Sequence, residues 1–141
     1  MNIKEVQINN FGKLKDKKIE FKKGINVVFG ENESGKSTLL KFITGMFYGI
    51  SKNKNGKRNS DYERFSPWNA GEYSGKMIYE LDNKDEFEIY RNFIKKNPQI
   101  LDKSGNDVSK KYNIDKTLGN QFFIEQTKVD EELFNMTLTM K

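Results

Sequence analysis

A cluster of glycines with one lysine and one serine lies in the first third of the chain. Residues 30–37 read Gly-Glu-Asn-Glu-Ser-Gly-Lys-Ser and fit the phosphate-loop pattern G-x-x-x-x-G-K-[ST] at every fixed position. Glycines let the backbone curl around an anion, because no Cβ blocks the approach, and successive N–H groups then point inward. The spacing therefore predicts the binding of nucleotide phosphates.

Each residue type in this motif has a predicted role. Lys36 would reach the β- and γ-phosphates, and the Ser37 hydroxyl would ligate the Mg²⁺ that bridges them. Thr38 and the backbone of residues 33–35 would complete the cradle. The predicted nucleotide-binding residues are Gly30, Glu31, Asn32, Glu33, Ser34, Gly35, Lys36, Ser37 and Thr38. The alternative is a Gly-rich strand-to-helix turn without a ligand.

The composition excludes several other chemistries. The 141-residue chain contains neither Cys nor His, which excludes disulfides, thiol catalysis, Cys/His zinc sites and Ser-His-Asp triads. No window approaches the ~18 apolar residues of a membrane span, and no apolar stretch follows Met1. We therefore expect a single domain over 1–141, with no membrane partner and a cytoplasmic location.

Positive charge is concentrated in the first part of the chain. The net charge is +5, made up of +8 over residues 1–60 and −3 over residues 61–141. Such a basic half suits phosphates of a nucleotide or of DNA, although a solvated lysine surface explains it equally well. The lysines that would grip DNA are those at positions 13, 15, 17, 18, 22 and 23.

The elements around the motif are predicted from periodicity. Alternating apolar residues indicate strands near 5–9 and 18–22, and the apolar run 25–29 suits a strand covered on both faces. The spacing then becomes helical over 36–50, with Gly49 as a plausible stop. The apolar stripe consists of Leu39, Phe42, Ile43, Met46, Phe47 and Ile50.

The second half of the chain reads as a loop, a hairpin and a helix. Residues 51–75 are expected to be irregular, 76–94 to form an antiparallel hairpin and 102–106 to turn. Asp115 is expected to cap a helix whose spaced residues are Phe122, Gln126, Val129 and Leu133. Residues 136–141 alternate like a half-buried strand.

Two segments resemble the ATPase heads of the SMC, SbcC, RecF and YhaN proteins, a subclass of the ABC-type ATPases. Residues 1–14 are similar to the opening strand of the subclass and its N-F-x-x-[FL] turn. Residues 24–40 are similar to its G-x-N-x-[IV]-x-G-x-N-x-[SA]-G-K-S-T-L-L segment. Residues 62–68, Tyr-Glu-Arg-Phe-Ser-Pro-Trp, followed by Gly71 and Gly75, look most like the YhaN branch.

The resemblance implies an α/β fold, the N-terminal lobe of such a head. Its mixed sheet would carry antiparallel hairpins around a P-loop strand and helix. It further implies ATP and Mg²⁺ as ligands, with Lys13 and Arg64 as additional contacts to the nucleotide. The implied partners are the C-terminal half of the same head, a second head in a dimer, and DNA. The implied role is ATP-driven closure of two heads in DNA repair or chromosome maintenance.

The parts that activate water in this subclass are expected beyond this chain. The pair Asp130-Glu131 does not resemble a Walker B motif, because polar residues precede it, and Asp130 is predicted to cap a helix instead. The Q-loop glutamine would follow Lys141, since Gln121 and Gln126 lie too early. We therefore expect the chain to bind nucleotide without hydrolysing it.

Two other functions remain open at this stage. The first is a free-standing P-loop kinase or GTPase, although the Asn-Lys-Asn-Gly stretch at 53–56 lacks the Asp of an N-K-x-D motif. The second is a nucleic-acid-binding module whose phosphate loop is vestigial. A preference for GTP would favour the first, and salt-sensitive DNA binding without nucleotide binding would favour the second.

Overall fold

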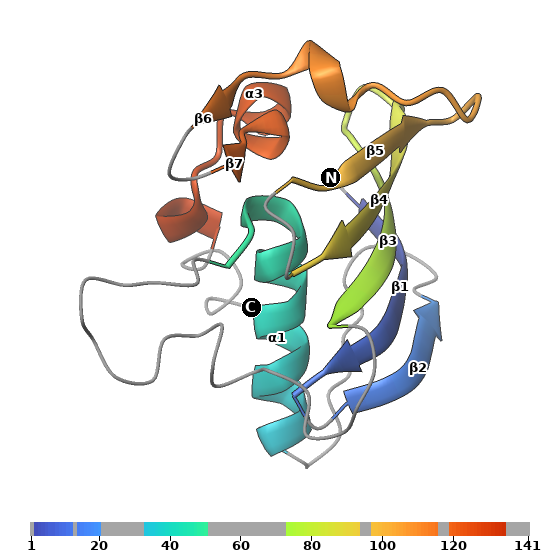
Figure 1. Ribbon diagram of the computed structural model, residues 1–141, viewed down its shortest axis with the longest axis vertical. Helices are drawn as coiled ribbons and strands as arrows, with labels where there is room; N and C mark the ends of the chain where they lie inside the picture. Colours follow the sequence, from blue (N-terminus) through green and yellow to red (C-terminus); the bar gives the residue numbers. More distant parts are fainter. Residues whose placement is uncertain are drawn as a thin grey trace.

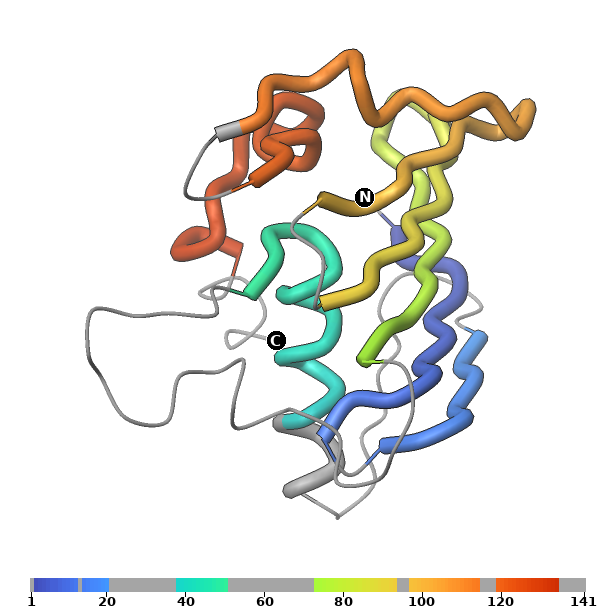
Figure 2. The backbone as a smooth tube through the Cα atoms, viewed as in Figure 1, coloured from blue at the N-terminus to red at the C-terminus, as the bar shows by residue number. Residues whose placement is uncertain are grey.

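The computed structural model describes the chain in six stretches: residues 2–12, 14–20, 33–50, 73–93, 97–115 and 119–134. A curved antiparallel sheet forms one layer, and one long helix lies along one of its faces (Figure 1). A smaller unit, formed by the last third of the described chain, lies beside the far end of that helix (Figure 2). Of residues 33–37 only the helical backbone is described.

The sheet contains five strands in the order β2-β1-β3-β4-β5. Every neighbouring pair in it is antiparallel. The strands are β1 (Asn2–Phe11), β2 (Leu14–Glu20), β3 (Ser74–Glu80), β4 (Glu86–Asn92) and β5 (Gln99–Asp102). The predicted early strands and the hairpin over 76–94 are therefore confirmed.

One row of apolar side chains crosses the inner face of the sheet. Val6 pairs with Met77, Met77 with Ile89, and Ile89 with Ile100. All four side chains are fully buried. Because side chains alternate between the two faces of a strand, this register turns the polar residues between them outward.

The long helix α1 (Glu33–Tyr48) covers that row. Its predicted stripe is confirmed, since the side chains at positions 39, 42, 43, 46 and 47 are buried and Ile50 packs against the core. The helix ends as predicted at Gly49, whose φ of +80° favours glycine and whose N–H donates to the Gly45 carbonyl at 2.7 Å.

The expectation that Asp115 caps a helix is wrong. Asp115 lies in β6 (Ile114–Asp115), which pairs with β7 (Gly119–Asn120) after the short helix η1 (Ser109–Lys111). The helix α3 begins later (Phe122–Thr127), and Asn120 Oδ1 accepts from the Phe122 N–H at 3.0 Å. Asn120 precedes the N-cap residue Gln121, and its buried side chain bonds the first N–H of α3 two residues on, as in an Asx turn.

The predicted helical stripe also breaks after Gln126. Lys128 adopts φ of +62° and ends α3, and its N–H donates to the Ile124 carbonyl at 2.7 Å. A new helical turn follows, and Asp130 Oδ1 accepts from the Leu133 N–H at 2.8 Å. The predicted N-cap at Asp130 is therefore confirmed, whereas Leu133 is 48% exposed and does not continue the stripe.

Aromatic rings join this last part of the chain to α1. Phe47 stacks on Phe123 at 3.8 Å between ring centroids, and Phe134 lies edge-on to Phe47 at 5.4 Å. Tyr79 of β3 contacts Phe47 at 5.1 Å from the sheet side. The end of α1, α3 and the turn at 131–134 thus share one hydrophobic core.

Several predicted elements lie outside the described residues. They are the apolar strand 25–29, residues 51–72 of the loop expected over 51–75, and the alternation over 136–141. The end of that expected loop is wrong, because Ser74 and Gly75 pair with β1 and β4 as part of β3. The helix and hairpins of the expected α/β fold are present in the part of the chain that the structure describes.

Candidate nucleotide-binding site

The phosphate-loop motif runs into the first turns of α1. The helix begins at Glu33, so Ser34, Gly35, Lys36 and Ser37 belong to it, whereas residues 30–32 lie outside the described part. The first N–H groups of a helix have no partner within it and carry partial positive charge, which favours an anion at this end. Thr38 is buried, so the helix is already in contact with the core one residue after the motif.

Gly75 of β3 allows α1 to lie close against the sheet. A Cβ at this position would come within 2.2 Å of Phe42 Cζ and 2.9 Å of the Gln7 carbonyl oxygen. No side chain larger than hydrogen fits there without a shift of the helix or the strand. The aromatic ring of Phe42 therefore fills the space above Gly75 and holds the middle of α1 against the sheet.

The end of β1 contacts the same part of the helix. Phe11, the last residue of β1, packs edge-on against Phe42 with 5.3 Å between centroids. Gly12 follows with φ of +56°. Lys13 and Arg64, predicted as additional nucleotide contacts, lie outside the described residues, so their positions remain predictions.

The opposite end of α1 is held by a buried arginine. Arg91 of β4 is 4% exposed, and its Nε and Nη2 donate to the Met46 carbonyl at 3.1 and 3.0 Å. A cation at a helix C-terminus is favourable because the last carbonyls carry partial negative charge. Burial lowers the pKa of Arg91 to about 9, since the charged form loses its hydration.

The described lysines on the outer face of the sheet do not form a purely basic surface. Lys18 of β2 lies 3.5 Å from both Glu5 and Glu20, and Lys4 Nζ lies 2.7 Å from Glu86 Oε1. Lys15 and Lys17 are exposed, while the other lysines proposed to grip DNA lie outside the described residues. The outer face of the sheet is thus a network of opposite charges, each pair contributing little in water.

Three residues were weighed as a Walker B carboxylate or a Q-loop glutamine, namely Asp130, Gln121 and Gln126. All three have structural roles. Asp130 caps a helical turn, and Gln126 is held between Tyr79 Oη at 2.5 Å and Tyr112 Oη at 2.9 Å. Gln121 Nε2 donates to the Gly119 carbonyl at 3.2 Å. Among the described residues, no group of three or more Asp or Glu side chains is arranged to hold a metal ion.

Sequence reasoning missed two residues that position the site, Arg91 and Gly75. The signal for Arg91 was its place at the apolar phase of an alternation, between Ile89 and Phe93. An arginine at such a position either points into the core or interrupts the alternation of inward apolar residues along the strand. The signal for Gly75 was weaker, because a glycine before a strand also suits the loop that was expected there.

No helix in the described part of the chain is long and apolar enough to cross a membrane.

Comparison with known proteins identifies the family. A family model described as an AAA domain matches residues 5–140. The chain is 39% identical over 89 residues to the DNA double-strand break repair Rad50 ATPase of Archaeoglobus fulgidus, which covers 63% of this chain and 9% of the relative. It is 31% identical over 108 residues to the DNA replication and repair protein RecF of a Thermoanaerobacter species, covering 77% and 28%.

A shorter match supports the same class. The RecF protein of Caldanaerobacter subterraneus is 43% identical over 51 residues, which is 36% of this chain and 14% of that protein. The chain spans about a tenth of the length of the Rad50 relatives that it matches.

Proposed function

The chain belongs to the AAA domain family, within the SMC, SbcC and RecF class of ABC-type ATPases, and from this premise we propose that it is the ATP-binding N-terminal lobe of a head that acts in DNA repair. The observation that carries the proposal is the complete phosphate-loop motif at the start of α1. DNA repair is the process that the names of the Rad50 and RecF relatives give. A nucleotide is the ligand that the phosphate-loop motif predicts.

The proposed site binds ATP with Mg²⁺ through Gly30–Thr38. The N–H groups at the start of α1 would surround the β-phosphate, Lys36 would neutralise the β- and γ-phosphates, and Ser37 would hold the metal ion. The anchoring of α1 supports this role, because the contact of Gly75 with Phe42 and the hydrogen bonds of Arg91 to Met46 hold the second half of the helix against the sheet. Preorganised donors lose little free energy when the phosphates bind.

The remaining parts of the proposed enzyme come from outside this chain. We propose that a C-terminal half of the head adds the carboxylates that activate water, and that a second head completes the nucleotide site. The closeness to the YhaN branch, the ATP-driven engagement of two heads, the contact with DNA and the cytoplasmic location are part of the same proposal. They rest on the resemblance and on the relatives' names.

Titration with ATP and Mg²⁺ tests the proposal. We expect Lys36→Ala to weaken binding by about 2–3 kcal/mol, or roughly 30- to 150-fold, because a charge-assisted contact to phosphate is lost. Lys103→Ala removes the same charge from an exposed turn and serves as the control, with affinity unchanged. Equal affinity of Lys36→Ala and the parent chain in calorimetry would contradict the proposal.

The same titration separates the two alternatives. Tighter binding of GTP than of ATP would favour a GTPase. Absence of nucleotide binding, together with DNA binding that weakens steeply with salt, would favour a nucleic-acid-binding module.

A further inference from the structure

One aromatic ring is exposed on the face of the sheet that is turned away from α1. A cross-strand row on this outer face consists of Gln7, Lys76, Tyr90 and Gln99. The row points outward because Ile89 and Ile100, the next residues on two of the strands, are buried in the core. Tyr90 is 42% exposed, and no other aromatic side chain in the described stretches is classed as exposed. Core packing therefore does not explain an aromatic residue in this polar row.

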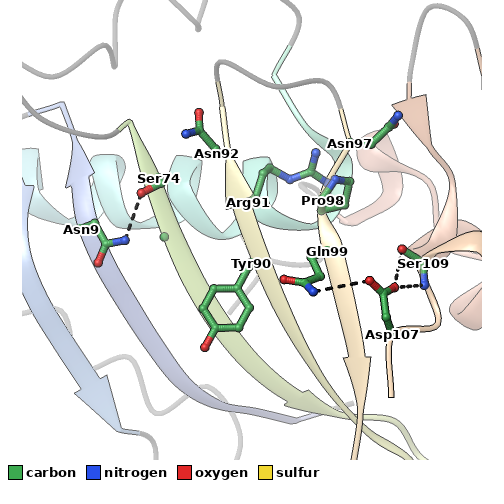
Figure 3. Close-up of a pocket in the computed structure, with 11 residues that line it drawn as sticks. Asn9, Ser74, Tyr90, Arg91, Asn92, Asn97, Pro98, Gln99, Asp107 and Ser109 are labelled. Carbon is green, nitrogen blue, oxygen red and sulfur yellow. Dashed lines mark hydrogen bonds between the residues drawn. The ribbon is translucent and has the colours of Figure 1, made fainter. Parts of the chain in front are cut away.

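A hollow of about 430 Å³ lies beside this ring. Tyr90 and Gln99 line it from the sheet, and Asp107 and Ser109 line it from the segment that follows β5. Figure 3 shows the Tyr90 ring nearly face-on, with Gln99 and Asp107 to one side of it. The hollow thus combines a flat aromatic surface with polar side chains at its edge.

The polar side chains at this edge keep hydrogen-bonding capacity. Gln99 Nε2 donates to Asp107 Oδ2 over a long distance of 3.5 Å. The other carboxylate oxygen, Oδ1, accepts from the Ser109 N–H at 2.9 Å and from the Ser109 hydroxyl. A side-chain amide has two N–H donors and an acceptor oxygen, and each carboxylate oxygen accepts two hydrogen bonds. Gln99 and Asp107 can therefore bind a ligand edge that carries both donors and acceptors.

A nucleobase has the shape and the polar edge that this arrangement suits. Unpaired bases stack on aromatic side chains, and every base has a π-face for such a contact. Base edges place donors beside acceptors, which an amide side chain matches at adenine and a carboxylate matches at the amino group of cytosine. Tyr90 and Gln99 are direct cross-strand neighbours, so the edge of a base on the ring comes within reach of the amide.

The charges around the ring favour a single strand over a duplex. Lys76 Nζ lies 5.6 Å from the centre of the Tyr90 ring, where it can accompany one phosphate. The same nitrogen lies 3.3 Å from Glu88 and 4.0 Å from Glu5, so its positive charge is balanced. Duplex binding depends on contacts to many phosphates, whereas stacking supplies much of the affinity for a single strand.

We propose that this hollow receives an unpaired base of single-stranded DNA, stacked on Tyr90 with its polar edge toward Gln99 and Asp107. The choice of DNA rests on the proposed function, through the names of the Rad50 and RecF relatives. The site lies on the opposite face of the sheet from α1, so it is separate from the phosphate loop.

Fluorescence anisotropy with labelled single strands of about 12 nucleotides tests the stacking contact. Tyr90→Ala should weaken the binding of a deoxycytidine strand about 5- to 30-fold, because the stacking surface is lost. Tyr90→Phe keeps the ring and should bind like the parent chain. Ile114→Ala removes another exposed apolar side chain, on β6, and serves as the control with unchanged affinity.

Two further measurements report on the base edge and on the charges. The parent chain should bind a deoxycytidine strand more tightly than a thymidine strand, and Asp107→Asn should reduce this preference, since thymine has no amino group for the carboxylate. The logarithm of the affinity should fall with the logarithm of the salt concentration with a slope of about −1, as expected for about one phosphate contact in a single strand.

Ultraviolet cross-linking of a strand that contains 5-iododeoxycytidine should label Tyr90, as read by mass spectrometry of the peptides. Equal single-strand affinities of Tyr90→Ala and the parent chain would overturn this proposal alone. Tighter binding of a duplex, or of the matching RNA strand, would also overturn it. Absence of binding to both single strands and duplex would in addition contradict the DNA contact in the proposed function, whereas ATP binding is tested separately by the Lys36→Ala titration.

Discussion

At the scale of single residues, Gly75 determines how closely α1 approaches the sheet. We expect Gly75→Ala to lower the free energy of unfolding by about 1–3 kcal/mol, because the new methyl group would overlap the ring of Phe42. Phe42→Leu alone should also destabilise the chain by leaving a cavity. In the double variant the two losses should partly cancel, since the smaller leucine makes room for the methyl group.

Denaturant unfolding of the two single variants and the double variant measures this coupling. Strictly additive losses would show that the close contact between Gly75 and Phe42 has no energetic weight.

A second residue-scale prediction concerns the hydrogen bonds that link Tyr79, Gln126 and Tyr112. Tyr79 is fully buried, and its hydroxyl donates to Gln126 Oε1, while Gln126 Nε2 donates to the half-buried Tyr112. We expect Tyr79→Phe to cost about 1–2 kcal/mol, because it leaves the Gln126 oxygen without its donor in the interior. Tyr112→Phe is the matched control and should cost less, since water can replace the lost partner there.

Thermal unfolding of both variants provides the comparison. An equal loss in the two would contradict a buried role for the Tyr79–Gln126 contact. The raised pKa of Tyr79, caused by its burial, means that its hydroxyl stays protonated and keeps donating across the neutral and mildly alkaline range.

At the scale of elements, the left-handed residue after α3 decides where that helix stops. Lys128 has φ of +62°, a conformation that costs a residue with a Cβ about 1–2 kcal/mol. We therefore expect Lys128→Gly to stabilise the chain by up to about 1 kcal/mol, after the extra entropy of glycine in the unfolded chain is subtracted. The change should appear as a rise of a few degrees in the melting temperature.

Lys110→Gly is the control for this prediction, because Lys110 lies in η1 and is not among the described residues with positive φ. It should leave the stability unchanged or lower it. A drop in the melting temperature of Lys128→Gly would show that the lysine side chain itself supports the end of α3.

At the scale of the whole molecule, we expect the 141-residue chain to bind ATP without turning it over. The residues that would supply phosphate contacts are in the sequence, whereas Asp130, Gln121 and Gln126 are engaged in capping and in internal hydrogen bonds. Phosphate release should therefore stay at the background rate and should not change in Lys36→Ala. Steady-state hydrolysis that depends on Lys36 would contradict this prediction.

The sequence by itself determined the elements whose signals are local. The helical stripe over 36–50, the stop at Gly49 and the hairpin over 76–94 each follow from residue types at short spacing, and the described parts agree. The phosphate-loop motif is equally local, and its role in binding stays a prediction. The cap at Asp130 was predictable for the same reason, because a cap bonds to backbone three residues away.

The tertiary structure decided whatever depends on contacts between distant segments. Asp115 has the residue type of a cap, yet pairing of β6 with β7 places it in a strand, and the first N–H of α3 bonds to buried Asn120 instead. Arg91 and Met46 are 45 residues apart, so no local pattern could show that one holds the helix end formed by the other. Free energy from such long-range burial outweighs local preference, and only the folded chain brings those groups together.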